Sequence, residues 1–114
     1  MPGLSFLLAL ALVANEPEPT VRVGSKTFTE SVILGEIAQG LIREAGVLSS
    51  HRRELGGTQV LFHALEANEL DVYPEYTGTI SGEILAGKGI RGEAALRSAL
   101  AERGDPSTPL ALQR

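Results

Sequence analysis

Short strand-like segments alternate with helix-like segments along this chain, and that order constrains the fold more than any other feature. The segment TVRVGS alternates Val21 and Val23 with polar residues and ends at Gly24, which is typical of a strand. A helical pattern follows it, and the whole chain has the order β-α-β-α-β-α-α. Strands separated by helices of this length are joined by right-handed crossovers as parallel neighbours. The sequence therefore predicts the α/β class, with a short parallel sheet and flanking helices.

The first helix has the clearest signals. Thr27 and Glu30 have the T-x-x-E spacing of a capping box, and Gly46 follows the last periodic position. Between these ends, apolar residues recur at helical spacing: Ile33, Leu34, Ile37, Ala38, Leu41, Ile42 and Ala45. We expect this apolar face to pack on the sheet and the opposite face to meet water.

The next elements are predicted from the same two patterns, the alternation of a strand and the apolar spacing of a helix. SHRREL, residues 50–55, indicates a polar edge strand, and a second helix begins at Thr58 as its cap and ends near Asn68. ELDVYP, residues 69–74, indicates a third strand that Pro74 stops.

The C-terminal part contains two more helical patterns, at residues 79–86 and 92–104. Residues 105–114 contain two prolines and no periodic spacing of apolar residues, so we expect an irregular tail there.

The N-terminus carries an uncharged apolar run, LSFLLALALVA, at residues 4–14, and the polar NEPEPT follows at once. The run is too short to span a bilayer as a helix, but it suits the apolar region of a secretory signal, although no Lys or Arg precedes it. The alternative, a buried element of the domain, conflicts with the Pro-Glu-Pro segment that follows. We therefore expect residues 1–20 to be a signal peptide and linker, and the protein to be periplasmic or otherwise extracytoplasmic.

Composition and charge argue against several classes of function. A net charge of −4 and the absence of a long basic run argue against nucleic acid as a partner. The chain has no cysteine for a disulfide framework or a thiolate metal site. His51 and His63 have no partner at metal-ligand spacing, and we expect both to be solvated or capping residues. No serine lies in a nucleophile motif, so we expect neither catalysis nor a cofactor.

Two nucleotide-binding patterns occur in GEILAGKGIRG, residues 82–92, but neither has the context it needs. Gly87, Gly89 and Gly92 match G-x-G-x-x-G, yet the residues before them indicate a helix rather than a strand. In the phosphate-loop pattern, Gly89 stands where a Ser or Thr would contact magnesium. We interpret the segment as a glycine-rich turn, and a nucleotide-dependent enzyme is the weakest alternative.

Polar groups gather where the predicted strands end. Ser25 and Lys26 lie in the first strand-to-helix turn, beside a helix N-terminus that favours an anion. LGGTQ, residues 55–59, repeats this arrangement at the second helix, and YPEYTGT, residues 73–79, follows the third strand. The carboxyl ends of parallel strands share one edge of a sheet, where ligands tend to bind. We expect the three turns to form one rim, although a solvated lysine and a tyrosine packed on its own loop are the alternatives.

Three motifs carry a resemblance to a known family. G-S-K-x-F-T-E, L-G-G-T and Y-P-E-Y-T-G-T occur in the family's order and approximate spacing. Through them, residues 21–104 closely resemble the periplasmic substrate-binding proteins of osmoprotectant ABC transporters, those for glycine betaine, choline, carnitine and related compounds. The resemblance implies a type II periplasmic binding protein, with two α/β lobes that close on the ligand. Residues 21–104 would form a partial first lobe.

The resemblance also implies a ligand site. Family members hold a quaternary ammonium in a cage of tyrosines, and aromatic faces suit a cation that has no N–H to donate. By motif position, Tyr76 corresponds to a wall of the cage. Lys26 and Thr79 resemble the groups that bind the ligand's carboxylate. Ser25 and Tyr73 are expected to be supporting residues.

The partners that the resemblance implies are a small quaternary-ammonium ligand and the membrane permease of an ABC transporter. The chain covers only part of such a protein. A truncated remnant that does not bind, or an interaction module with the same fold, is therefore the alternative to a functioning binding protein.

Overall fold

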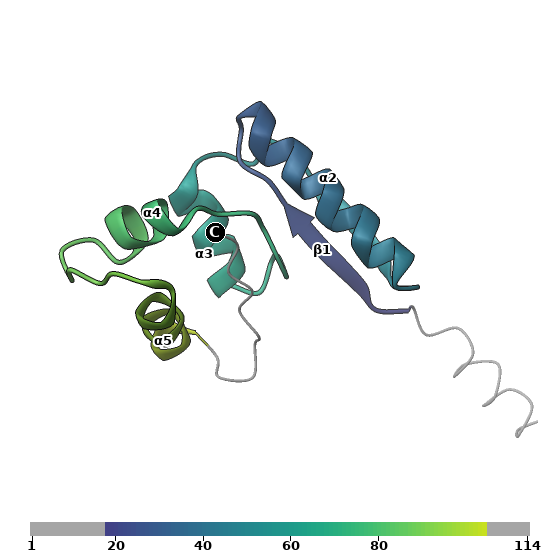
Figure 1. Cartoon of the computed structure of the whole chain (residues 1–114). Coiled ribbons are helices and arrows are strands. Elements are labelled where there is room, and N and C mark those ends of the chain that lie inside the picture. Colours follow the sequence, from purple (N-terminus) through teal and green to yellow (C-terminus); the bar gives the residue numbers. More distant parts are fainter. Residues whose placement is uncertain (1–17, 105–114) are drawn as a thin grey trace, which may run out of the picture.

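Two parallel strands and the helices around them make up the part of the chain that the structure describes. This computed structural model describes residues 18–104. Strand β1 (Thr20–Gly24) pairs in parallel with strand β2 (Leu48–Arg52), and helix α2 (Thr29–Glu44) joins them and lies along β1 (Figure 1). Parallel neighbours need such a crossover. The predicted α/β class is confirmed.

Two predicted segments fall outside this description. Most of the predicted signal peptide and linker, residues 1–20, and all of the predicted tail, residues 105–114, lie outside the described residues.

The predicted third strand, residues 69–74, is reduced to one bridge. Val72 pairs in parallel with Val23, on the side of β1 opposite β2. The Gly24 N–H donates to the Val72 carbonyl at 2.9 Å, and the Asp71 N–H donates to the Arg22 carbonyl at 2.9 Å. Pro74 has no N–H with which to continue the ladder. The position and direction of the segment were predicted correctly, but its length was not.

The predicted second strand, residues 50–55, begins and ends earlier than expected. β2 runs from Leu48 to Arg52. Glu54 then adopts a left-handed backbone conformation with φ of 54°, which ends the extended run. After this turn, the Leu55 N–H donates to the Ser25 carbonyl at 3.0 Å, so the chain stays against the end of β1.

Helix α2 turns a partly different face to the sheet from the one predicted. Its buried residues are small or polar: Ser31, Gly35 and Gln39. Of the apolar residues that we expected to pack on the sheet, three are more than half exposed, Ile33 (53%), Ile37 (54%) and Leu41 (65%). On the same predicted face, Leu34, Ala38 and Ile42 are partly buried. The prediction was wrong in part, because the β2 face beneath α2 carries His51 against Gly35 and Ser49 hydrogen-bonded to Gln39.

Both predicted helix caps were wrong. Helix α2 begins at Thr29 with Phe28 as its N-cap, and no side chain there caps it, so Thr27 and Glu30 do not form a capping box. Helix α3 (Thr58–Glu66) has Gly57 as its N-cap. Thr58 is instead its first residue, and the Thr58 hydroxyl donates to Glu75.

The remaining helices enclose a separate apolar core. Helix α4 (Thr77–Thr79) continues into the π-helical turn η1 (Ile80–Ile84), which confirms a helical segment near residues 79–86, and α5 (Glu93–Arg103) confirms the last one. Figure 1 shows α3, α4 and α5 grouped beside the pair formed by β1 and α2. Six buried residues from these elements and the turn after η1 pack together: Phe62, Ile80, Ile84, Leu85, Leu96 and Leu100. Within residues 18–104, no helix is long and apolar enough to cross a membrane.

Candidate ligand site at the ends of the strands

The three predicted turns meet at the ammonium group of Lys26. Lys26 follows the end of β1, and only 5% of its surface is exposed. Its Nζ donates to Glu75 Oε1 at 2.6 Å and to Thr58 Oγ1 at 3.0 Å. Because these residues come from the first, second and third turns, the predicted convergence on one rim is present in the structure.

Glu75 connects the site through both of its carboxylate oxygens. Besides Lys26, its Oε1 accepts the Tyr76 N–H at 3.0 Å. Its Oε2 accepts the Thr58 hydroxyl at 3.1 Å and the Tyr73 hydroxyl at 3.2 Å. The Glu75 and Lys26 side chains are each only 6% exposed. A buried ion pair is costly unless further hydrogen bonds support it, and here the Thr58 and Tyr73 hydroxyls both donate to the Glu75 carboxylate.

The two tyrosines of the motif occupy different environments. Tyr73 packs against the apolar core. Burial, followed by the negative charge of Glu75, raises the pKa of the Tyr73 hydroxyl well above its ordinary value. Tyr76 is 36% exposed, and its ring lies over the Lys26 ammonium, 5.9 Å from ring centroid to Nζ. Desolvation raises the pKa of Tyr76, and so does its hydrogen bond with Glu30, so both phenols are neutral at pH 7.

Thr79 lies apart from this group of contacts. It is the last residue of α4, three positions after Tyr76, and it is partly buried. Within residues 18–104, no hydrogen bond joins the Thr79 side chain to Lys26. The structure thus brings Lys26, Tyr73 and Tyr76 together through Glu75, while Thr79 follows on the adjacent helical turn.

Ser25 belongs to a second buried network that starts at the same turn. Its hydroxyl pairs with His51 Nε2 at 2.8 Å, and His51 Nδ1 pairs with Glu36 Oε1 at 2.9 Å. The His51 side chain is 1% exposed, so the prediction that it would be solvated or capping was wrong. The order of groups resembles a Ser-His-Glu triad, but Ser25 has no exposed surface. A substrate therefore has no route to its oxygen in this conformation.

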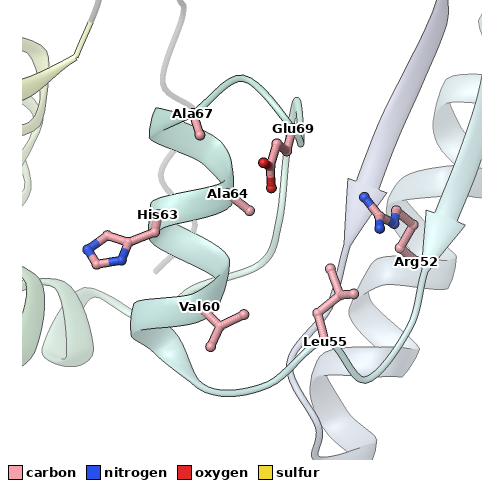
Figure 2. A pocket seen from close by; sticks show the side chains of 7 residues that line it. All are labelled: Arg52, Leu55, Val60, His63, Ala64, Ala67 and Glu69. Atoms are coloured by element: carbon pink, nitrogen blue, oxygen red, sulfur yellow. The ribbon is translucent and has the colours of Figure 1, made fainter.

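A shallow groove lies elsewhere, between α3 and the end of β2, with a volume of about 340 Å³. Its lining residues are Arg52, Leu55, Val60, His63, Ala64, Ala67 and Glu69. Figure 2 shows Leu55 and Val60 projecting toward one another across it, whereas His63 points away. None of the predicted site residues lines this groove.

The sequence reasoning missed three residues that the structure places at Lys26. Glu75 lies inside the YPEYTGT motif. Because Glu75 and Lys26 each follow a strand of the predicted parallel sheet, the sequence could have indicated an ion pair between them. Thr58 was interpreted only as a helix cap. Phe28 is the aromatic residue of G-S-K-x-F-T-E, and its ring centroid lies 5.2 Å from Lys26 Nζ.

A family model matches residues 19–108 of this chain, and its description is the substrate binding domain of the ABC-type glycine betaine transport system. The match covers most of the sequence. The chain therefore belongs to this family of transport-associated substrate-binding domains, and the partial lobe of a type II periplasmic binding protein inferred from the motifs is confirmed.

Two comparisons involve a particular protein of this family. The chain is 41% identical over 76 residues to the glycine betaine-binding protein YehZ of Escherichia coli strain K12, an alignment that covers 67% of this chain and 25% of YehZ. The solved structure of apo YehZ from E. coli superposes with a TM-score of 0.62 at 28% identity, covering 78% of this chain and 32% of that one. The chain thus spans between a quarter and a third of the length of this relative.

Proposed function

We propose that this chain acts in the capture of a quaternary-amine osmoprotectant, such as glycine betaine or choline, as the substrate-binding component of an ABC importer, and that it is not an enzyme. Family membership supports the transport role. The observation that carries the ligand class is the geometry at Lys26, where a nearly buried ammonium lies over exposed aromatic rings at the carboxyl ends of the strands. Aromatic faces attract quaternary ammonium groups, which have no N–H to donate.

In this proposal, the ligand's cationic group contacts the outer face of the Tyr76 ring. Its carboxylate, where it has one, meets Lys26 and Thr79. Ser25 and Tyr73 support the site, since Ser25 holds His51 beneath the turn and Tyr73 donates to Glu75. Residues 21–104 are part of the first lobe behind a signal peptide and linker at residues 1–20, the protein works in the periplasm, and the permease of the transporter is its partner.

Isothermal titration calorimetry with glycine betaine, choline and carnitine tests this proposal. We expect a saturable heat with at least one ligand, and its loss in Tyr76→Ala and in Lys26→Met. Lys88 is the other lysine of the chain and lies on an exposed turn, so Lys88→Met is the matched control and should bind as the parent does. A folded parent chain that gives no heat with any of the three ligands would refute the proposal.

A second candidate is an interaction module of the same fold, or a remnant that does not bind ligand. The observation that favours it is the exposed apolar stripe of α2, formed by Ile33, Ile37 and Leu41. Exposed apolar patches are found at protein–protein contact sites. The same titration separates the two candidates, because only the first requires binding by the folded chain.

A further inference from the structure

Two aromatic rings flank the Lys26 ammonium, and the resemblance assigned a role to only one of them. The centroid of the Phe28 ring lies 5.2 Å from Nζ, and that of Tyr76 lies 5.9 Å away. Phe28 is the N-cap of α2 and Tyr76 is the N-cap of α4, so two separate helix starts present the rings to one point. Both rings remain partly open to solvent, with 44% of Phe28 and 36% of Tyr76 exposed.

The ammonium has a donor left for a ligand. A lysine side chain carries three N–H donors, and those of Lys26 that have protein partners point to Glu75 and Thr58. Within residues 18–104, no acceptor takes the third donor. The remaining groups beside Nζ are the two rings, which accept no conventional hydrogen bond.

Backbone geometry holds Phe28 in this place. As the N-cap residue of α2 it has an extended conformation, with φ of −84° and ψ of 153°, and its carbonyl accepts the Val32 N–H at 3.3 Å. One residue earlier, the Thr27 N–H donates to the Gly56 carbonyl at 3.0 Å, which ties this turn to the turn before α3. The Phe28 ring is therefore exposed on a backbone that is fixed on both sides.

We propose that Phe28 is a second ligand-contacting aromatic residue, and that it forms with Tyr76 the two sides of a site for a carboxylated quaternary ammonium. The carboxylate accepts the free N–H of Lys26, and the methyl groups lie against both rings. This inference rests on the proposed function and narrows its ligand class. A ligand without a carboxylate, such as choline, leaves the third Lys26 donor unpaired and binds less tightly.

The test is a titration of the full chain with glycine betaine and choline, followed by calorimetry and by the NMR shifts of the aromatic protons. Removing a cation–π contact at a partly exposed site should weaken glycine betaine binding about threefold to thirtyfold in Phe28→Leu. Phe28→Trp, which retains an aromatic face, should bind at least as tightly as the parent. Ile33→Ala removes another exposed apolar side chain from the same helix and should have no effect.

The outcomes distinguish failure of this inference from failure of the proposed function. Unchanged binding in Phe28→Leu together with lost binding in Tyr76→Ala would overturn this inference and leave the proposed function standing. Equal affinity for choline and glycine betaine would overturn the ligand class. A folded parent chain that binds neither of these ligands, nor carnitine, would overturn both proposals. Phe28→Trp guards against a folding artefact, because a merely structural role for Phe28 predicts that the larger tryptophan weakens binding as well.

Discussion

Replacing Glu75 with glutamine tests whether the buried pair with Lys26 organises the ends of the strands. The substitution keeps the size of the side chain and one carbonyl acceptor, but it removes the negative charge. Lys26 then keeps a nearly buried ammonium, 6% exposed, without a counter-charge. We expect glutamine to destabilise the fold chiefly through this unpaired charge.

The magnitude follows from the burial of both partners. Removing one partner of a buried ion pair costs about 3–5 kcal/mol, and the low end applies here because glutamine still accepts a hydrogen bond. A small domain has a total stability of roughly 5–15 kcal/mol. The expected loss of about 3 kcal/mol is therefore a large fraction of the free energy of unfolding. With roughly 4–8 °C of Tm per kcal/mol, the melting temperature should fall by more than about 10 °C.

A double-mutant cycle with Lys26→Met isolates the pair. In that single variant, the Glu75 carboxylate keeps the hydroxyl donors of Thr58 and Tyr73. The double variant carries neither buried charge, so its loss should be smaller than the sum of the single losses by about 1–3 kcal/mol. Non-additivity of this size would identify a direct interaction rather than two independent packing defects.

Urea unfolding followed by far-ultraviolet circular dichroism measures these free energies. Lys88→Met and Glu83→Gln change exposed residues of the same two types, and each should stay within about 0.5 kcal/mol of the parent. If Glu75→Gln costs less than about 1 kcal/mol and adds simply to Lys26→Met, the reasoning about the buried pair is wrong.

Two further predictions concern packing and pH. Gly35→Ala should lower the free energy of unfolding by about 1–3 kcal/mol, because the new Cβ would lie 2.7 Å from Cε1 of the buried His51 ring. Gly40→Ala on the same helix, with nothing within 4 Å of the added Cβ, should be neutral or stabilising, and equal effects of the two in a thermal melt would contradict this packing. A hydrogen bond from Arg22 lowers the pKa of Asp71 in the folded protein below its ordinary value of 3.8. The stabilisation from this hydrogen bond is therefore fully present above the ordinary pKa and is lost as the pH falls through the lower pKa of the folded state. Urea midpoints should therefore fall below about pH 4, with a smaller fall in Asp71→Asn.

The sequence located the elements of the fold better than it located their contacts. Apolar spacing placed α2 correctly, but the buried face that it indicated was only partly right, because Ile33, Ile37 and Leu41 are exposed. The face that meets the sheet is chosen by Gly35, whose missing side chain leaves room for His51, and by Gln39, which donates to the Ser49 carbonyl at 3.3 Å. Such fits depend on residues distant in the chain, and no local period reports them.

The candidate site was predictable to the same degree. Parallel strands end at one edge of a sheet, and this rule alone predicts that Lys26 and the YPEYTGT motif lie close together. The rule does not predict which side chains are in contact. The ion pair between Lys26 and Glu75 joins residues 49 positions apart in the chain. Motif position alone assigned the aromatic role to Tyr76, whereas Phe28 is a candidate only because of the distance from its ring to Nζ.

Lys26 contributes both to the stability of this fold and to the proposed binding. Binding data for a Lys26 variant can therefore be interpreted only together with its stability. Its ammonium holds the three turns together through Glu75 and Thr58, so any Lys26 variant changes the shape of the rim as well as removing a donor. Loss of binding in Lys26→Met alone therefore fits either role. Phe28 lies over the same ammonium, but its ring takes part in no hydrogen bond of the ion-pair network. A change of affinity in Phe28→Leu at unchanged stability would thus report on the ligand alone, and it is the variant that separates recognition from folding at this site.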